Sequence, residues 1–231
     1  MPTGRRPCAL LFRAEMKQDL FVKICGITNQ EDAKFAARCG ADAVGFVFHK
    51  ESPRFISHHR AAEIVRSLPD HISKIGVFVN ADMMFVRGIV NHVNLSAVQL
   101  LGNNGPDDLV NFETSVIKVF RVQKDFEVEI MRNYIVDAFL LDTYKEGSYG
   151  GTGKAFDWNI AIKAKEYGRI ILSGGLNPEN VEDAIRFVRP YGVDVSSGVE
   201  GSPGRKDPKK VREFIKRAKS IPVSYHGDDE D

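Results

Sequence analysis

The sequence predicts an α/β fold, a single (β/α)8 barrel of parallel strands. Eight short apolar segments alternate with eight helical segments along the chain, which is the pattern of strand–helix units that build a parallel sheet. Some strands, such as residues 42–48, are apolar almost throughout, as expected when helices cover both faces of the sheet. No linker or change of composition interrupts the alternation, which favours one closed barrel over a doubly wound open sheet. A chain of 231 residues, 43% of them hydrophobic, can bury the large core that this fold needs.

The expected strands share an apolar run that ends in a polar residue or a loop. They span residues 21–25, 42–48, 73–80, 97–100, 116–120, 138–142, 170–173 and 193–196. The expected helices carry apolar residues at helical spacing. They span residues 29–39, 57–68, 81–92, 106–111, 126–133, 157–167, 178–187 and 207–219. Thr28 or Asn29 caps the first helix and Gly40 ends it, whereas Asn177 caps the seventh.

The barrel is expected to occupy residues 21–220 as one catalytic domain. Residues 1–20 are predicted to be a poorly ordered N-terminal extension, and Met16 offers an alternative start just ahead of the first strand. The apolar run 8–12 in this extension is too short for a secretory signal and is followed by charged residues. Residues 221–231 are predicted to be an acidic tail that frays.

The composition argues against several classes of partner. Lysine and arginine (32) nearly equal aspartate and glutamate (31), so no overall field attracts nucleic acid or anionic lipid. No segment approaches the ~20 apolar residues of a membrane span. The three cysteines, Cys8, Cys25 and Cys39, are odd in number and lack metal-type spacing, which predicts reduced thiols in the cytoplasm. A small molecule is therefore the expected partner, and the sequence predicts no particular protein partner.

Two residues with acid–base chemistry end predicted strands. Cys25 ends the first strand, and Asp142 ends the sixth after four apolar residues. The C-terminal ends of the strands surround the active site in a barrel, so a thiol and a carboxyl group there suit paired proton transfer. The thiol must then ionise near neutral pH, against a usual pKa of ~8.5, and Asp142 must hold its proton. The alternatives are a small buried hydrophobic residue for Cys25 and a loop-capping aspartate for Asp142.

Three charged residues near these strand ends each have two interpretations. Lys23 shares a face with Cys25, because alternate strand residues point the same way, and it either stabilises the thiolate or forms a structural ion pair. Asp194 lies in the eighth strand and needs a partner if it is buried; it serves either the ligand or the barrel interior. Arg54 follows the second strand and either binds a carboxylate with two hydrogen bonds or is a solvated loop residue.

Glycine-rich segments follow the last two strands. They are residues 173–176, with Gly174 and Gly175, and residues 196–201, with Ser196, Ser197 and Gly198. Loops at this end of a barrel commonly bind phosphate through backbone N–H groups, so a phosphorylated ligand is predicted. A third segment, residues 150–154, is interpreted as a lid over the site or as a plain turn.

Eight short motifs of this chain occur together in one enzyme family. They are residues 23–28 (KICGIT), 40–48 (GADAVGFVF), 52–54 (SPR), 76–80 (GVFVN), 141–143 (LDT), 150–158 (GGTGKAFDW), 173–176 (SGGL) and 194–200 (DVSSGVE). In this order they closely resemble phosphoribosylanthranilate isomerase, over about residues 21–218. The resemblance implies an Amadori rearrangement in tryptophan biosynthesis, which converts N-(5-phosphoribosyl)anthranilate into 1-(2-carboxyphenylamino)-1-deoxyribulose 5-phosphate. It implies no metal and no organic cofactor.

The resemblance also implies roles for individual residues. Asp142 matches the general acid that protonates the furanose ring oxygen, and Cys25 matches the general base that removes the proton from C2. Arg54 matches the residue that binds the anthranilate carboxylate, Asp194 would lie near the substrate amine, and the two glycine-rich segments match the phosphate site. The chain has Leu101 where the family often has histidine, which puts in doubt a polar contact from that loop.

Two alternatives to this function stay open. The first is the related sugar isomerase of histidine biosynthesis, which uses two aspartates and has phosphate-site glycines in both halves of the chain. This chain instead ends its first strand in Cys25, and its first half has residues 77–80 in place of a glycine pair. A barrel that binds a phosphorylated metabolite without converting it is the second alternative, and the intact pair of Cys25 and Asp142 argues against it.

Overall fold

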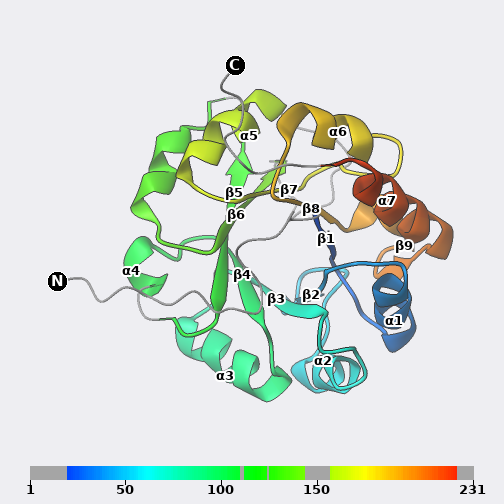
Figure 1. The fold of residues 1–231 in the computed structure, drawn as a ribbon. Helices are drawn as coiled ribbons and strands as arrows, with labels where there is room; N and C mark the ends of the chain where they lie inside the picture. Colours follow the sequence, from blue (N-terminus) through cyan, green and yellow to red (C-terminus); the bar gives the residue numbers. More distant parts are fainter. Residues whose placement is uncertain (1–19, 110–111, 124, 144–156, 223–231) are drawn as a thin grey trace.

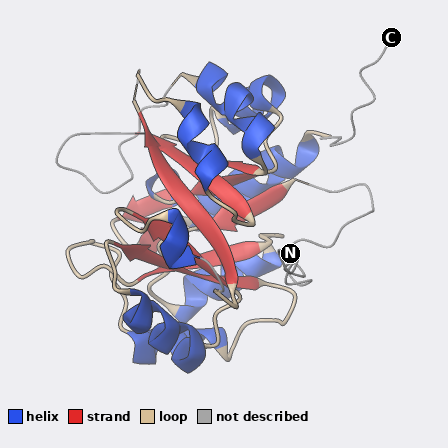
Figure 2. Ribbon diagram, turned by 90° about the vertical axis from the view of Figure 1, so that its left-hand side faces the viewer, coloured by secondary structure: helices blue, strands red, loops and turns tan. Residues whose placement is uncertain are grey.

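The computed structural model describes residues 20–109, 112–123, 125–143 and 157–222. The predicted fold is confirmed, because strands β1 to β8 pair in sequence order and close into a barrel. All pairs are parallel, including the pair of β1 with β8 that closes the ring. The helices lie around the outside of the strands (Figure 1), and the side view shows the strands enclosed by helices (Figure 2).

The strands and helices follow the expected order. The barrel strands are β1 (Phe21–Ile24), β2 (Ala43–Val47), β3 (Ser73–Val79), β4 (Ala97–Leu101), β5 (Ser115–Val122), β6 (Ala138–Thr143), β7 (Ile170–Leu172) and β8 (Gly192–Val195). The α-helices are α1 (Gln30–Arg38), α2 (His58–Val65), α3 (Met83–Val93), α4 (Pro106–Leu109), α5 (Trp158–Ala164), α6 (Val181–Val188) and α7 (Pro208–Ser220).

Several local elements differ from the expected ones. The fifth predicted helix is a 3-10 helix, η1 (Val128–Asn133), and the sixth ends in a 3-10 turn, η2 (Lys165–Tyr167). After β8 the chain forms a short 3-10 helix, η3 (Ser197–Val199), and an antiparallel hairpin, β9 (Glu200–Ser202) with β10 (Arg205–Lys206), that were not predicted.

The structure decides between the predicted helix caps. Asn29 caps α1, since its side chain accepts a hydrogen bond from the backbone N–H of Asp32 at 2.9 Å. The predicted cap at Asn177 is wrong, because α6 begins later and Asn180 is its N-cap residue. The Asn177 side chain instead accepts from the backbone N–H groups of Glu179 and Asn180 and closes a turn ahead of the helix.

The barrel extends one residue beyond each predicted boundary. Leu20 and Ile221, which the sequence analysis assigned to the extension and to the tail, are 2% and 8% exposed and pack in the core. Both side chains are apolar, so their burial adds favourable free energy. The predicted disorder of residues 1–19 and 223–231 concerns parts of the chain outside the described residues.

Inward-pointing side chains fill the barrel in layers, as expected for this fold. The part of the interior toward the N-terminal ends of the strands is apolar. It contains Phe21, Ala43, Ile75, Ala97, Ile117, Val119, Ala138, Leu140, Ile171 and Tyr191. Alternate residues of a strand share a face, so the side chains of Phe21, Lys23 and Cys25 all point into the barrel, in this order along the chain. The interior therefore changes from apolar to polar along β1, toward the C-terminal ends of the strands.

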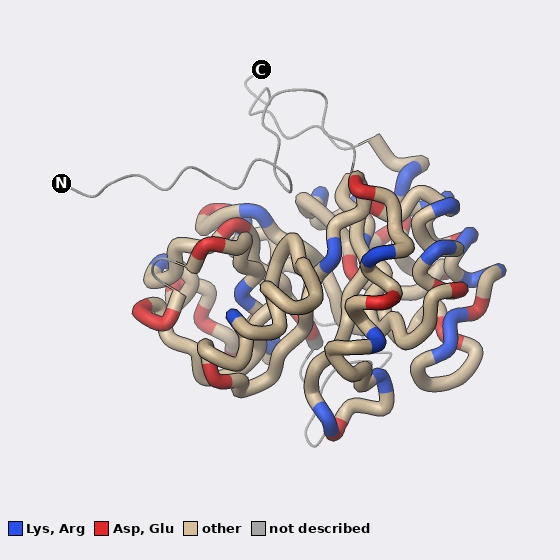
Figure 3. The backbone as a smooth tube through the Cα atoms, turned by 90° about the horizontal axis from the view of Figure 1, so that it is seen from below, with Lys and Arg blue, Asp and Glu red and all other residues tan. Residues whose placement is uncertain are grey.

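Charges of both signs are interspersed over the described backbone (Figure 3), in keeping with the near-zero net charge. Among the described residues, no helix combines the length and the apolar character that crossing a membrane requires.

Candidate active site

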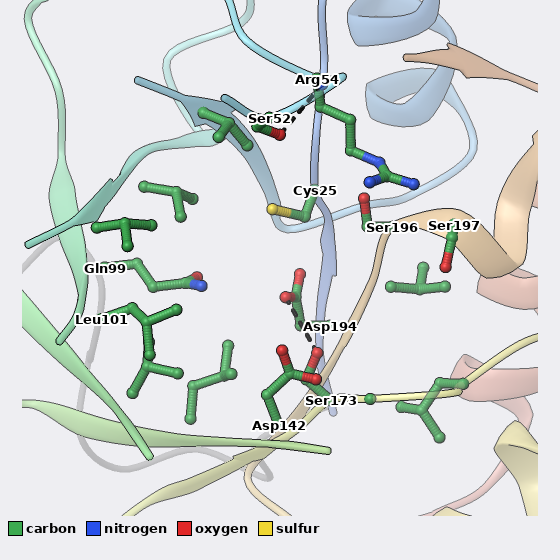
Figure 4. A pocket seen from close by; sticks show the side chains of 18 of the residues that line it. Cys25, Ser52, Arg54, Gln99, Leu101, Asp142, Ser173, Asp194, Ser196 and Ser197 are labelled. Atoms are coloured by element: carbon green, nitrogen blue, oxygen red, sulfur yellow. Dashed lines mark hydrogen bonds between the residues drawn. The ribbon is translucent and has the colours of Figure 1, made fainter. Parts of the chain in front are cut away.

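One cavity lies at the C-terminal ends of the barrel strands (Figure 4). It is lined by Cys25, Val47, His49, Ser52, Arg54, Val77, Val79, Gln99, Leu101, Val119, Leu140, Asp142, Ser173, Gly174, Gly175, Leu176, Asp194, Val195, Ser196 and Ser197. Eight of the nine predicted site residues are in this lining. The ninth, Gly198, follows Ser197 at the rim, and the predicted lid at residues 150–154 lies outside the described residues.

The thiol of Cys25 occupies a tightly packed position directly after β1. Its backbone N–H donates to the carbonyl oxygen of Val195 on β8 at 2.8 Å, and the residue is only 6% exposed. Gly45 on β2 makes room for it, since a Cβ atom there would lie 2.8 Å from the sulfur. Gly26 follows with a φ of +75°, which favours glycine, and lets the chain turn sharply away from the cavity. Cys25 therefore points into the cavity from a rigid strand end.

Lys23 is fully buried one layer below Cys25 and forms an ion pair across the barrel seam. Its Nζ donates to Asp194 Oδ1 and to Gln99 Oε1, each at 2.8 Å. Lys23 and Asp194 are direct register partners on β1 and β8, which brings residues far apart in sequence together. Burial lowers the pKa of Lys23, but the negative charges of Asp194 and of ionised Cys25 outweigh this effect and raise it above its usual value. Lys23 thus forms the buried ion pair of one interpretation from the sequence, and it is not among the residues that line the cavity.

Opposing charges act on the Cys25 thiol. Burial raises the pKa of Cys25, and the Asp194 carboxylate raises it further, whereas Lys23 and Lys206 lower it. The net result is a pKa above the usual value, which favours the neutral thiol. The two lysines are the positive charges that stabilise its thiolate.

Asp142 enters the same cavity from β6. The residue is half-buried, and Figure 4 shows its carboxyl group pointing into the cavity beside Ser173 and Asp194. Ser173 Oγ donates to Asp194 Oδ2 at 3.4 Å. The structure therefore brings Cys25 and Asp142 into one cavity from strands β1 and β6, as the sequence predicted.

Arg54 is held in place by Glu200, a residue that the sequence analysis did not select. Arg54 Nε and Nη2 donate to the two carboxylate oxygens of Glu200 at 2.9 and 2.7 Å. Lys206 Nζ donates to the same carboxylate at 3.0 Å and to the carbonyl oxygen of Ser196 at 3.1 Å. Burial raises the pKa of Glu200, but its hydrogen bonds with Arg54 and Lys206 outweigh this and hold that pKa below its usual value. Glu200 is the last residue of the quoted 194–200 motif, which was the available signal.

The two glycine-rich loops pack directly against each other at the edge of the cavity. Gly174 and Gly175 have φ angles of +80° and +75°, which favour glycine. A Cβ atom on Gly198 would overlap the carbonyl oxygen of Leu176, so only glycine allows this approach. The hydroxyl of Ser196, the first residue of the loop after β8, is buried near Gly26 and has no hydrogen-bond partner among the described residues. A buried hydroxyl of this kind is satisfied when a polar ligand accepts its hydrogen bond.

Three further residues of the cavity lining are Gln99, Ser173 and Leu101. Gln99 and Ser173 fix the two charged residues of the ion pair, and neither was selected from the sequence. Leu101 is half-buried and lines the cavity at the position where the family often has histidine. Leu101 therefore presents an apolar wall to the cavity from the end of β4.

The fold and the cavity define this protein as a TIM-barrel enzyme with its site at the C-terminal ends of the strands. A family model described as N-(5'-phosphoribosyl)anthranilate (PRA) isomerase matches residues 22–217. The chain belongs to this family, which confirms both the resemblance and the predicted isomerase activity.

Individual relatives cover nearly all of the barrel. The N-(5'-phosphoribosyl)anthranilate isomerase of Geotalea uraniireducens is 52% identical over 200 residues, which are 87% of this chain and 98% of the relative. The crystal structure of phosphoribosyl anthranilate isomerase from Thermotoga maritima is 44% identical, with a TM-score of 0.81, and covers 87% of this chain and all of that chain (100%). A further crystal structure of the isomerase contains reduced 1-(o-carboxyphenylamino)-1-deoxyribulose 5-phosphate; it is 41% identical, has a TM-score of 0.78, and covers 87% of this chain and 100% of its own.

Proposed function

We propose that Cys25 and Asp142 are the general base and the general acid in the isomerisation of N-(5-phosphoribosyl)anthranilate. The observation that carries the proposal is their placement in one cavity, Cys25 directly after β1 and Asp142 on β6, together with Arg54 and the two glycine-rich loops. The substrate has a carboxylate at one end and a phosphate at the other. The cavity offers a guanidinium group and glycine-rich loops to these two ends.

The proposed reaction needs two proton transfers. Asp142 donates a proton to the furanose ring oxygen, so that the C1–O bond breaks and the anthranilate nitrogen forms a Schiff base with C1. Cys25, as thiolate, then removes the proton from C2; the electron pair of that C–H bond forms the C1–C2 double bond, and the π electrons of the C1–N bond return to the protonated nitrogen, which gives an enolamine. Protonation at C1 and loss of the hydroxyl proton at C2 give the ketone. Each positioned acid or base contributes about 10²- to 10⁴-fold to such a reaction.

The environment of Cys25 suits a base that acts on carbon. Its raised pKa makes the thiolate a stronger proton acceptor, although less of it is present at pH 7. Lys23, which is charged and held by Asp194 and Gln99, stabilises the thiolate from the layer below. In this proposal the main role of Asp194 is to hold Lys23 through their ion pair. Its contact with the substrate amine stays a prediction.

Arg54 is proposed to bind the anthranilate carboxylate. A guanidinium group matches a carboxylate through paired hydrogen bonds, and Glu200 accepts from Nε and Nη2 and so leaves the remaining donors for the ligand. The local charge supports anion binding, because Arg54 and Lys206 carry two positive charges against the one negative charge of Glu200.

The phosphate is proposed to lie between the loops after β7 and β8. The backbone faces the cavity at Gly174 and Gly175, which have left-handed φ angles, and at Ser197, where η3 begins. The Ser196 hydroxyl adds a hydrogen-bond donor that has no partner among the described residues. This is the usual phosphate position in barrels.

We also propose that the reaction takes place in the cytosol, where the free thiols of Cys25 and Cys39 stay reduced.

Steady-state kinetics of Asp142→Asn test the proposal. The fluorescence of the anthranilate group is followed after addition of freshly prepared N-(5-phosphoribosyl)anthranilate, with its spontaneous decay subtracted. The expected result is a fall in kcat of at least about 10²-fold with little change in KM, because the acid acts in the transition state. Asp183→Asn, an exposed change on α6, serves as the matched control and should retain full activity.

Other outcomes would change the assignment. A raised KM with a normal kcat in Asp142→Asn would make Asp142 a binding residue. Wild-type protein that binds the substrate in calorimetry without converting it would support the binding-only alternative.

A further inference from the structure

Three histidines meet on the outer helix layer of the barrel. His58 and His59 begin α2, and His92 lies in the last turn of α3. The ring centroids of His58 and His59 are 4.2 Å apart, and the His92 ring lies 5.0 and 5.1 Å from them in edge-on contacts. None of the three lines the cavity that contains Cys25. The cluster is therefore separate from the proposed active site.

We propose that His58, His59 and His92 bind one divalent transition-metal ion of the zinc class. Each residue offers a ring nitrogen, and the three nitrogens lie within 4.8 Å of one another. Zn–N bonds of about 2.0–2.1 Å in a tetrahedral site place ligand nitrogens ~3.3 Å apart, so small side-chain rotations of the exposed His59 and His92 and the half-buried His58 would close the site. Three histidines leave a fourth position for water.

The surroundings of the cluster favour this class of ion. None of the three histidines has a hydrogen bond or ion pair to another of the described residues, so their nitrogens are available. The nearest carboxylate along α2, that of Glu63, is engaged with Arg60 at 2.7 Å. A ligand set made of imidazoles suits zinc, copper or nickel, whereas magnesium and calcium prefer oxygen ligands.

The position of the cluster gives metal binding a measurable effect on stability. A bound ion would join the N-terminus of α2 to the C-terminus of α3. It would stabilise the folded chain by mass action, since the unfolded chain does not hold the three rings together.

The experiment uses full-length protein without an affinity tag, freed of metal by a chelator. Zinc chloride is titrated in a calorimeter, and thermal unfolding is recorded with and without zinc. We expect one ion per chain and a higher melting temperature with zinc. His92→Gln should weaken binding at least about tenfold, whereas His71→Gln, an exposed histidine outside the cluster, should bind like the wild type.

Cobalt(II) in place of zinc identifies the ligands, because thiolate ligation produces an intense charge-transfer band that nitrogen ligation lacks. The proposal predicts a tetrahedral cobalt spectrum without that band, and its loss in His92→Gln. Three results would overturn the proposal: a thiolate band, equal zinc binding by His92→Gln and wild type, or no binding at submillimolar zinc. Melting of His92→Gln without metal, which should match the wild type, shows that the variant is folded.

Discussion

Arg54 and Glu200 form a two-point ion pair at the mouth of the barrel, with donor–acceptor distances of 2.9 and 2.7 Å, although 146 residues separate them in the sequence. The arginine belongs to the loop after β2, and the glutamate begins the hairpin after β8. In the proposed function, the pair fixes the guanidinium before the substrate binds, which lowers the entropy lost on binding. Glu200 is thus a positioning residue for Arg54.

Glu200→Gln should weaken substrate binding more than it slows the chemical step. Glutamine keeps the shape of the side chain but removes the charge that holds Arg54. We expect KM to rise about tenfold, which corresponds to ~1.4 kcal/mol, with a smaller change in kcat. The matched control is Glu213→Gln, which breaks a comparable Glu–Arg pair on the surface of α7 and should leave both constants unchanged. A large fall in kcat with unchanged KM would contradict the positioning role.

The same variant should change the pH dependence of stability. The pKa of Glu200 is lowered in the folded protein, because its hydrogen bonds with Arg54 and Lys206 outweigh burial. Its stabilising contribution is therefore present above the unfolded pKa of ~4.3 and is lost as the pH falls through the folded pKa. In urea unfolding, the difference in unfolding free energy between wild type and Glu200→Gln should be constant above about pH 6 and shrink below about pH 4. A difference that is independent of pH over this range would refute the assignment.

Lys23→Met should destabilise the barrel strongly. The change leaves the Asp194 carboxylate buried without its cation, and breaking a buried ion pair costs about 3–5 kcal/mol. The free energy of unfolding in urea measures this loss. Lys216→Met, which alters an exposed lysine on α7, should change it by less than about 0.5 kcal/mol. A loss below about 1 kcal/mol in Lys23→Met would show that the pair does not matter for stability.

Gly198→Ala should disturb the proposed phosphate site. The new methyl group would overlap the backbone oxygen of Leu176, so one of the two loops must move. We expect KM to rise at least about tenfold, a loss of ~1.4 kcal/mol in binding. Gly88→Ala is the control, because no atom outside the adjacent backbone of α3 lies within 4 Å of the added Cβ. It should stabilise the protein by up to about 1 kcal/mol and leave KM unchanged.

The regular part of the fold was predictable from local patterns. The alternation of apolar strands with amphipathic helices depends on neighbouring residues, and it placed Cys25 and Asp142 correctly at strand ends. The position of each element in the closed ring then brought these two residues into one cavity. The 3-10 geometry of η1 was missed, because the apolar pattern over these six residues does not distinguish it from an α-helix.

The partners of the charged residues were not predictable in the same way. The pairing of Lys23 with Asp194 depends on the register between β1 and β8, which exists only once the barrel closes. Glu200 binds Arg54, and Lys206 binds Glu200, through a hairpin with strands of three and two residues, which are too short to show a strand pattern. Contacts of this kind follow from the tertiary structure and leave no periodic signal in the sequence.

The most direct test of the proposed chemistry is the kcat of Cys25→Ala at saturating N-(5-phosphoribosyl)anthranilate, with Cys39→Ala as the control at the end of α1. If Cys25 is the base that removes the C2 proton, kcat falls by about 10²- to 10⁴-fold, KM stays within a few-fold of the wild type, and Cys39→Ala is fully active. A Cys25→Ala enzyme whose kcat lies within about threefold of the wild type would contradict the assignment of Cys25 as the base.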